Sequence, residues 1–99
     1  MAINIMITDD HSMIREGLKN LLELDGDIKV IAEAENGEEC LDKLKTFKPD
    51  VLLLDINMPQ MNGFEVLKIM KRSQCIAETP VIMISSEDAV NTMRKAYEL

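Results

Sequence analysis

The chain has 99 residues, which is enough for one compact domain and too few for two. Hydrophobic residues make up 46% of the sequence and charged residues 29%, proportions that are typical of a folded globular protein. The formal net charge is -7 and lysine and arginine form no cluster, so direct binding to nucleic acid or to an anionic membrane is not expected.

The ends and the cysteines of the sequence point to the cytoplasm. The first residues, "MAINIMITDD", have none of the features of a signal peptide, and no apolar run is long enough to span a membrane. Cys40 and Cys75 are far apart and belong to no metal-binding or redox motif. We therefore expect a cytoplasmic protein with two reduced thiols that serve only in packing or at the surface.

Four short apolar stretches alternate with segments of helical periodicity, and this alternation predicts a parallel α/β sheet. The expected strands are Ile3 to Thr8, Lys29 to Ala34, Val51 to Asp55 and Val81 to Ser85. The third and fourth strands are apolar at consecutive positions, which indicates that both of their faces are covered. With right-handed crossovers, and with the second strand outside the first, the first and third strands become neighbours.

Helices are expected in the segments between the strands and after the last of them. The first starts at about Ser12, as N-cap, and stops near Asp25 and Gly26; the second follows "ENG" and is ended by Pro49; the third starts around Gly63; the fourth follows "SSED". The residues expected to face the sheet are Ile14, Leu18, Leu21 and Leu22, then Leu41, Leu44 and Phe47, then Phe64, Leu67 and Met70, and finally Val90, Met93 and Tyr97.

Acidic residues follow two strands that are expected to be neighbours. Asp9 and Asp10 come directly after the first strand, and Asp55 closes the third; Ser85 ends the fourth strand, next to the third. In an open parallel sheet the ligand site lies beyond the carboxyl ends of the strands. Three carboxylates gathered there would repel one another, so the arrangement calls for a cation.

Mg2+ suits these ligands best, because it prefers hard oxygen atoms and keeps several waters. No set of thiolates or imidazoles indicates zinc. With a cation in place, Asp55 is the candidate nucleophile for attack on phosphorus, and the product would be an aspartyl phosphate. Ser85 is the candidate hydroxyl donor to the phosphoryl group, and its movement would change the surface around the fourth helix. In the loop after Asp55, Pro59 fixes one backbone angle and Gly63 permits unusual ones.

Each of these residues also has a simpler interpretation. Asp9 and Asp10 could form a solvated start to a helix, and Ser85 could be an N-cap or a loop serine, with Ser86 competing for the cap. His11 is expected to start the first helix and to face solvent, with only about a one in ten chance of direct chemistry. Met6, Met70, Met83 and Met93 fall at core positions, whereas Met58 and Met61 are expected to be exposed.

The residues closely resemble the receiver domain of bacterial two-component response regulators, a CheY-like fold. The resemblance rests on "ITDDHSMIREGL", "DINMPQMNGFEVL" and "PVIMISS", and it covers essentially the whole chain. "DDHSMIREGL" is further similar to the receivers of the NarL/FixJ subfamily, which carry a C-terminal helix-turn-helix DNA-binding domain. The fold this implies is a three-layer doubly wound sheet of the flavodoxin type with strand order 2-1-3-4.

The resemblance implies a role for each residue of the site. Asp55 would accept a phosphoryl group from a histidine kinase or phosphotransfer protein, with Mg2+ bound by Asp9, Asp10, Asp55 and the backbone carbonyl of Asn57. Ser85 matches the switch hydroxyl of the family. Such a receiver phosphorylates itself and slowly loses the group again, so it is not a conventional turnover enzyme.

Family members also have a fifth strand with a lysine and an aromatic switch residue, followed by a fifth helix, and this chain stops at Leu99 before all three. Lys95 and Tyr97 fall on the fourth helix and match neither residue. We therefore interpret residues 1–99 as a receiver domain that is incomplete at its C-terminus, with impaired phosphotransfer. Its exposed sheet edge predicts a homodimer, a swapped oligomer or marginal stability.

Two other functions stay open from the sequence alone. One is a protein-interaction module that works without phosphorylation, which the missing lysine favours and the complete acidic set disfavours. The other is a metal-dependent phosphatase with an aspartyl nucleophile, which would typically carry a second acid two residues later, where this chain has Asn57.

Overall fold

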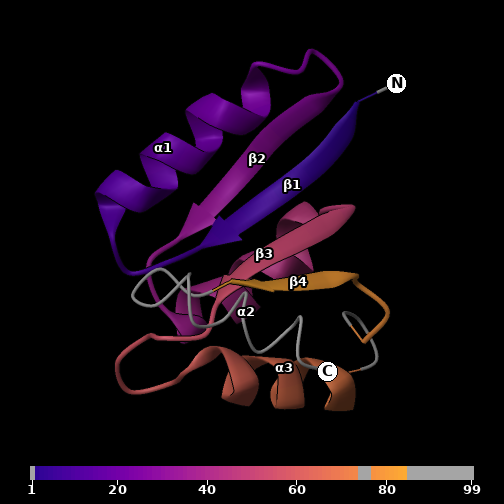
Figure 1. Cartoon of the computed structure of the whole chain (residues 1–99). Coiled ribbons are helices and arrows are strands. Elements are labelled where there is room, and N and C mark those ends of the chain that lie inside the picture. Colours follow the sequence, from indigo (N-terminus) through magenta and orange to yellow (C-terminus); the bar gives the residue numbers. More distant parts are fainter. Residues whose placement is uncertain (1, 74–76, 85–99) are drawn as a thin grey trace, which may run out of the picture.

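A computed structural model describes residues 2–73 and 77–84 of the chain. The elements are β1 (Ile3–Thr8), α1 (Ser12–Glu23), β2 (Ile28–Ala34), α2 (Gly37–Phe47), β3 (Val51–Asp55), α3 (Gly63–Arg72) and β4 (Val81–Ile84) (Figure 1). The expected fourth helix, with Val90, Met93, Lys95 and Tyr97, lies outside the described residues, as do Cys75, Ser85 and Ser86.

The four strands form one parallel sheet in the order β2-β1-β3-β4, which confirms the predicted fold class and strand order. Thr8 pairs with Leu54 where β1 and β3 end, and Asp55 pairs with Ile84 across β3 and β4. The chain segments that leave β1 and β3 therefore start side by side at the carboxyl edge of the sheet.

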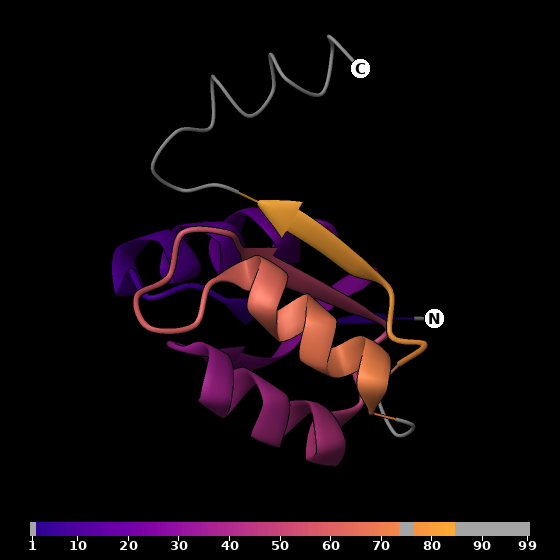
Figure 2. The ribbon, with the colours of Figure 1, turned by 90° about the horizontal axis from the view of Figure 1, so that it is seen from below.

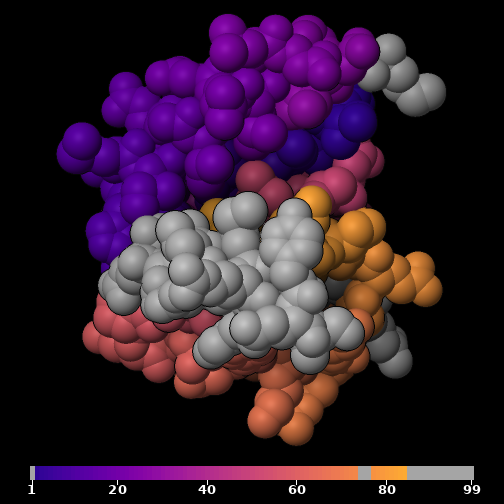
Figure 3. Space-filling view, viewed as in Figure 1, coloured from indigo at the N-terminus to yellow at the C-terminus, as the bar shows by residue number. Residues whose placement is uncertain are grey.

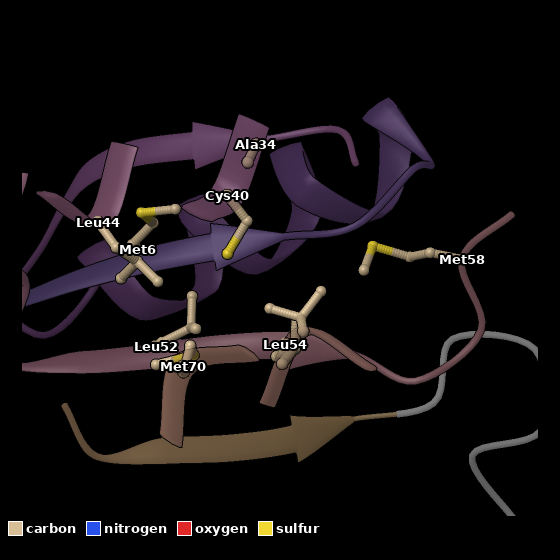
Figure 4. Packing of buried hydrophobic residues seen from close by; sticks show 9 residues of the cluster. Met6, Ala34, Cys40, Leu44, Leu52, Leu54, Met58 and Met70 are labelled. Atoms are coloured by element: carbon tan, nitrogen blue, oxygen red, sulfur yellow. The ribbon is translucent and has the colours of Figure 1, made fainter. Parts of the chain in front are cut away.

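The sheet is covered on both faces, giving three layers (Figure 2). On one face α1 packs over β1 and β2, with Leu18 and Leu22 against a small cluster of buried strand residues: Ile5, Ile7, Val30 and Leu53. On the other face α2 and α3 enclose the larger cluster: Met6, Ala34, Cys40, Leu44, Leu52, Leu54, Met58, Val66 and Met70 (Figure 4). Cys40 is fully buried, and burial raises the pKa of its thiol to about 11, so the thiol stays protonated and serves in packing as predicted.

The outer strands differ from the inner ones in how well they are covered. The space-filling view places the indigo and purple N-terminal elements on one side of the molecule and the orange α3 and β4 on the opposite side (Figure 3). β3 is covered on both faces, as its run of aliphatic residues predicted. In β4, however, Ile82 is 54% exposed, because α1 packs mainly over β2 and β1.

Several residues that were predicted to face the core are exposed, and the pitch of each helix explains why. Leu21, Phe47 and Phe64 are 65%, 45% and 59% exposed. The contact stripe of α3 is Gly63, Val66 and Met70, and Phe64 lies about 200° around the helix from Val66. Leu21 is similarly rotated by about 100° from Leu22, which does pack, and Phe47 is the last residue of α2.

The loop methionines also differ from prediction. Met58 is 6% exposed and Met61 packs against the core, so the expectation that both are exposed was wrong. Figure 4 shows the Met58 side chain lying beyond Leu54, at the end of the larger cluster. Of the methionines predicted to be internal, Met6 and Met70 are fully buried and Met83 packs against the same cluster.

Lys48 ends α2 in a left-handed backbone conformation, with φ at 47°. A residue with a side chain is disfavoured in this conformation by about 1–2 kcal/mol, and glycine is not. Glycine loses more conformational entropy on folding, so only part of this difference would appear as a gain in stability. Lys48→Gly is therefore expected to raise the free energy of unfolding by about 0.5–1 kcal/mol, as measured by urea denaturation. The matched control is Lys45→Gly inside the same helix, which should lower it by about 1 kcal/mol. A loss of stability in both variants would contradict the prediction.

Candidate functional site

The structure brings together the three acids that the sequence singled out. Asp9 and Asp10 directly follow β1, and Asp55 is the last residue of the neighbouring strand β3. One ligand atom from each of these residues, and one from His11, all lie within 4.8 Å of one another. The cluster thus forms because two neighbouring parallel strands end at the same edge of the sheet.

Burial makes this cluster unusual. Asp9 and Asp55 are 0% exposed, and Asp10 is partly exposed. The Asp9 Oδ1 atom accepts a hydrogen bond of 2.8 Å from the His11 backbone N–H, but Asp9 Oδ2 is buried with no hydrogen-bond partner among the described residues. Buried carboxylates that repel one another, with an acceptor unsatisfied, are the environment that a bound cation would stabilise.

Asp55 is held in place by the chain that follows it. Its Oδ1 atom accepts a hydrogen bond of 3.0 Å from the backbone N–H of Asn57. The intervening Ile56 donates its N–H to the carbonyl oxygen of Ile84 at 2.7 Å, which extends the pairing of β3 with β4 by one step. The Asn57 N–H therefore orients the Asp55 carboxylate, while the Ile56 N–H fixes the adjoining backbone against β4.

Gly63 serves a different purpose from the one that the sequence predicted. It has no positive φ; the left-handed residue of this loop is Gln60, with φ at 68°. A Cβ atom on Gly63 would instead lie 2.6 Å from the Asp55 carbonyl oxygen and 3.0 Å from Ile56 Cα. Glycine is thus required because the start of α3 lies directly against the end of β3, the strand that carries Asp55.

Arg15 is a residue of the site that the sequence analysis missed. Its Nη1 atom donates to the backbone carbonyl of Asp9, and its Nε atom donates to Glu33 Oε1 at 3.3 Å. Asp9 N–H also donates to the carbonyl of Ala34 at 3.0 Å. The Asp9 backbone is therefore fixed from both sides, by β2 and by α1. The only sequence signal was an arginine one helical turn after "DDH".

His11 was expected to face solvent, and this was only partly right. It is the N-cap residue of α1, in place of the predicted Ser12, and its side chain is 43% exposed. Its Nδ1 atom nevertheless lies 3.1 Å from Asp9 Oδ1 and 3.0 Å from Asp10 Oδ1. The imidazole therefore contacts two of the three acids at the solvent side of the cluster.

These contacts raise the pKa of His11 above its ordinary value of 6.5, first through the hydrogen bond with Asp9 and then through the charges of Asp10, Asp9 and Asp55, while partial desolvation opposes them. We expect NMR titration of this single histidine to give a midpoint above 6.5 in EDTA. Asp9→Asn should move the midpoint down. Because folding raises the pKa of His11, the contacts of protonated His11 with the acids stabilise the folded state. This stabilisation is fully present below the pKa of His11 in the unfolded chain, and it is lost as the pH rises through the pKa in the folded protein. A midpoint at or below 6.5 in the parent protein would contradict this.

Comparison with known proteins tests the resemblance. Residues 5–99 match the family model described as the response regulator receiver domain. The chain belongs to this family. The receiver is 38% identical over 96 residues to the nitrate/nitrite response regulator protein NarL of Escherichia coli, covering 95% of the chain and 44% of NarL. It is 36% identical over 95 residues to the transcriptional regulatory protein YdfI of Bacillus subtilis, covering 96% of the chain and 43% of YdfI.

Solved structures agree with the sequence matches. The receiver superposes on the response regulator domain of Thermotoga maritima CheB with a TM-score of 0.79 and 36% identity, covering 98% of this chain and 72% of that one. It superposes on the receiver domain of the putative response regulator NarL of Mycobacterium tuberculosis with a TM-score of 0.77 and 35% identity, covering 98% of this chain and 77% of that one. The receiver spans less than half of the curated relatives named above. Across its described residues, no helix is long and apolar enough to cross a membrane.

Proposed function

We propose that this receiver accepts a phosphoryl group on Asp55 from the phosphohistidine of a histidine kinase or a phosphotransfer protein, and so acts in phosphorelay signalling. One observation carries the proposal: Asp55 is fully buried at a strand end, where atoms of its carboxylate, of Asp9, of Asp10 and of His11 all lie within 4.8 Å of one another. Aspartate is mostly found at protein surfaces, so two fully buried aspartates beside a third indicate a functional cluster.

The acidic cluster is suited to Mg2+, with Asp9, Asp10, Asp55 and the backbone carbonyl of Asn57 as the proposed ligands. The fit rests on the buried Asp9 Oδ2 atom that lacks a partner and on an all-oxygen set of carboxylates, which hard divalent cations prefer. When bound, the cation would neutralise charge on the transferring group. The protein's own contribution is to hold the carboxylates in place and to exclude water from Asp9 and Asp55.

In the proposed step, a carboxylate oxygen of Asp55 forms a bond to phosphorus while the bond from phosphorus to the donor imidazole nitrogen breaks, and the electron pair of that bond stays on the departing nitrogen, which leaves as part of a neutral imidazole that carries a proton on its other nitrogen. The Asn57 N–H fixes the orientation of the Asp55 carboxylate for this attack. Ser85, outside the described residues, is the proposed hydroxyl donor to the transferred group, and its movement would change the surface around the fourth helix. In a longer parent protein, that change would be passed to an output domain such as a DNA-binding domain.

The test is incubation with acetyl phosphate and Mg2+, followed by mass spectrometry of the intact protein. We expect the mass of one phosphoryl group to be gained, and Asp55→Asn to lose the gain completely. The matched control is Asp42→Asn, which removes an exposed acid on α2 and should leave the gain intact. Rapid hydrolysis of acetyl phosphate with no accumulation of phosphorylated protein would indicate a phosphatase instead. No gain of mass in the parent protein would indicate an interaction module that works without phosphorylation.

A further inference from the structure

The His11 imidazole lies at the solvent side of the acidic cluster and offers a nitrogen atom as a ligand, whereas Mg2+ prefers oxygen. We propose that His11 supplies a nitrogen ligand to the cation held by Asp9, Asp10 and Asp55, which makes this a mixed nitrogen and oxygen site that binds Zn2+ and related transition metals more tightly than Mg2+. The inference rests on the proposed cation site, and it adds a ligand and a metal class to it.

The spacing of the side-chain atoms supports coordination. Adjacent ligands of a metal with bonds of about 2.0–2.1 Å lie about 3 Å apart. His11 Nδ1 lies 3.1 Å from Asp9 Oδ1 and 3.0 Å from Asp10 Oδ1, and all four groups, Asp55 included, offer atoms within 4.8 Å. A single ion can therefore contact all four with small side-chain rotations.

An independent observation is that one buried oxygen atom of the cluster has no hydrogen-bond partner among the described residues. Asp9 is 0% exposed, and its Oδ2 atom has no hydrogen-bond partner among the described residues, although His11 already contacts the other oxygen of the same carboxylate. The imidazole therefore contacts only one of the two oxygen atoms of this buried carboxylate. A metal ion bound between the imidazole and the carboxylates would reach more of these oxygen atoms than the imidazole does alone.

The backbone keeps the imidazole close to the acids. The His11 N–H donates to Asp9 Oδ1 at 2.8 Å, and the His11 carbonyl accepts the N–H groups of Ile14 and Arg15, both at 3.1 Å, which fixes the residue at the start of α1. The side chain itself is 43% exposed, so its ring can rotate to admit and release an ion. Neutral imidazole is a good ligand for Zn2+, Co2+ and Ni2+, whereas Mg2+ prefers oxygen.

The proposal predicts competition between metals. Zn2+ held by His11 and Asp55 together would engage the carboxylate that is proposed to accept the phosphoryl group. Zn2+ should therefore reduce phosphorylation of the parent protein by acetyl phosphate at a fixed Mg2+ concentration, and it should do so less in a variant that lacks the imidazole.

The direct test uses NMR with 15N-labelled histidine, because the chain has a single histidine. Cys75→Ser is the background, so that the thiol of Cys75 cannot bind Zn2+. We expect Zn2+ to shift the ring-nitrogen signals of His11, with Nδ1 as the ligand. In calorimetry, His11→Gln should weaken Zn2+ binding by about tenfold or more, the size of effect that changes around metal ligands commonly have. The same variant should change Mg2+ affinity by less than this.

The outcomes separate this proposal from the proposed function. If Mg2+ shifts the NMR signals of the three acids but Zn2+ leaves the His11 ring unmoved, or if His11→Gln binds Zn2+ as tightly as the parent does, the nitrogen ligand is wrong and the phosphoacceptor proposal stands. If neither ion shifts any residue of the cluster, the nitrogen ligand and the proposed Mg2+ site both fail.

Discussion

Asp9→Asn is expected to make the protein more stable than the parent in EDTA, and to remove the stabilisation that Mg2+ gives the parent. Asp9 is fully buried within 4.8 Å of two other carboxylates, so neutralising it relieves repulsion. The asparagine oxygen can still accept the His11 N–H, and its amide can donate to a neighbouring carboxylate where Oδ2 lacks a partner. We expect a gain of about 1–2 kcal/mol, within the usual cost of leaving a buried acceptor unsatisfied.

Thermal unfolding with EDTA and with Mg2+ measures both effects. A gain of 1 kcal/mol corresponds to a rise of about 4–8 °C in Tm for a domain of this size. The parent should gain about 2.7 kcal/mol when Mg2+ is present at a hundred times its Kd, and Asp9→Asn should gain little at the same concentration. Asp42→Asn, on the exposed surface of α2, should keep the parent's response to both conditions. A loss of stability in EDTA would show that Asp9 is held by favourable contacts rather than strained by repulsion.

The strand order and the acidic cluster could be predicted from the sequence because both follow from local patterns. Aliphatic runs that alternate with helical periodicity specify a parallel sheet, and right-handed connections place β1 beside β3. Once those strands are neighbours, Asp9 and Asp55 must lie together, since both are at carboxyl ends. No tertiary detail was needed for this step.

The helix faces and the loop after β3 could not be predicted in the same way, because they depend on where each helix lies over the sheet. Phe64 and Val66 are equally apolar in sequence, but only Val66 points inward. Met58 is buried because its side chain lies at the end of the larger cluster, beyond Leu54, which a single sequence does not reveal. Arg15 was missed because its partners, the Asp9 carbonyl and Glu33, become neighbours only when α1 packs beside β2.

The capping residues were a signal that could have been used. Both α2 and α3 begin with Asn-Gly and carry a glutamate three residues after the asparagine, in "NGEE" and "NGFE". Asn36 accepts the N–H of Glu39 at 2.8 Å, and Asn62 accepts the N–H of Glu65 at 3.0 Å. This repeated pattern marks both helix starts.

Gly63→Ala is expected to destabilise the protein by about 1–3 kcal/mol, the usual cost of adding a methyl group to a packed site. The new Cβ would lie 2.6 Å from the carbonyl oxygen of Asp55 and 3.0 Å from both Ile56 Cα and Met83 Cε. The Met83 methyl group can move, but the two backbone atoms belong to the end of β3 and its continuation, so relief of the clash must displace Asp55 or α3. We therefore expect weaker Mg2+ binding as well as lower stability.

The matched control is Gly17→Ala, because Gly17 lies inside α1 and a Cβ there would meet nothing within 4 Å. That variant should gain up to about 1 kcal/mol from the better helix propensity of alanine. Urea denaturation gives the two changes in stability, and backbone NMR shows whether the Asp55 and Asn57 signals move in Gly63→Ala and stay in place in Gly17→Ala. Equal stability of the two variants, with the Asp55 signal unmoved, would mean that α3 can shift away from β3 at little cost. The acidic site would then not depend on the close contact of Gly63 with the strand end.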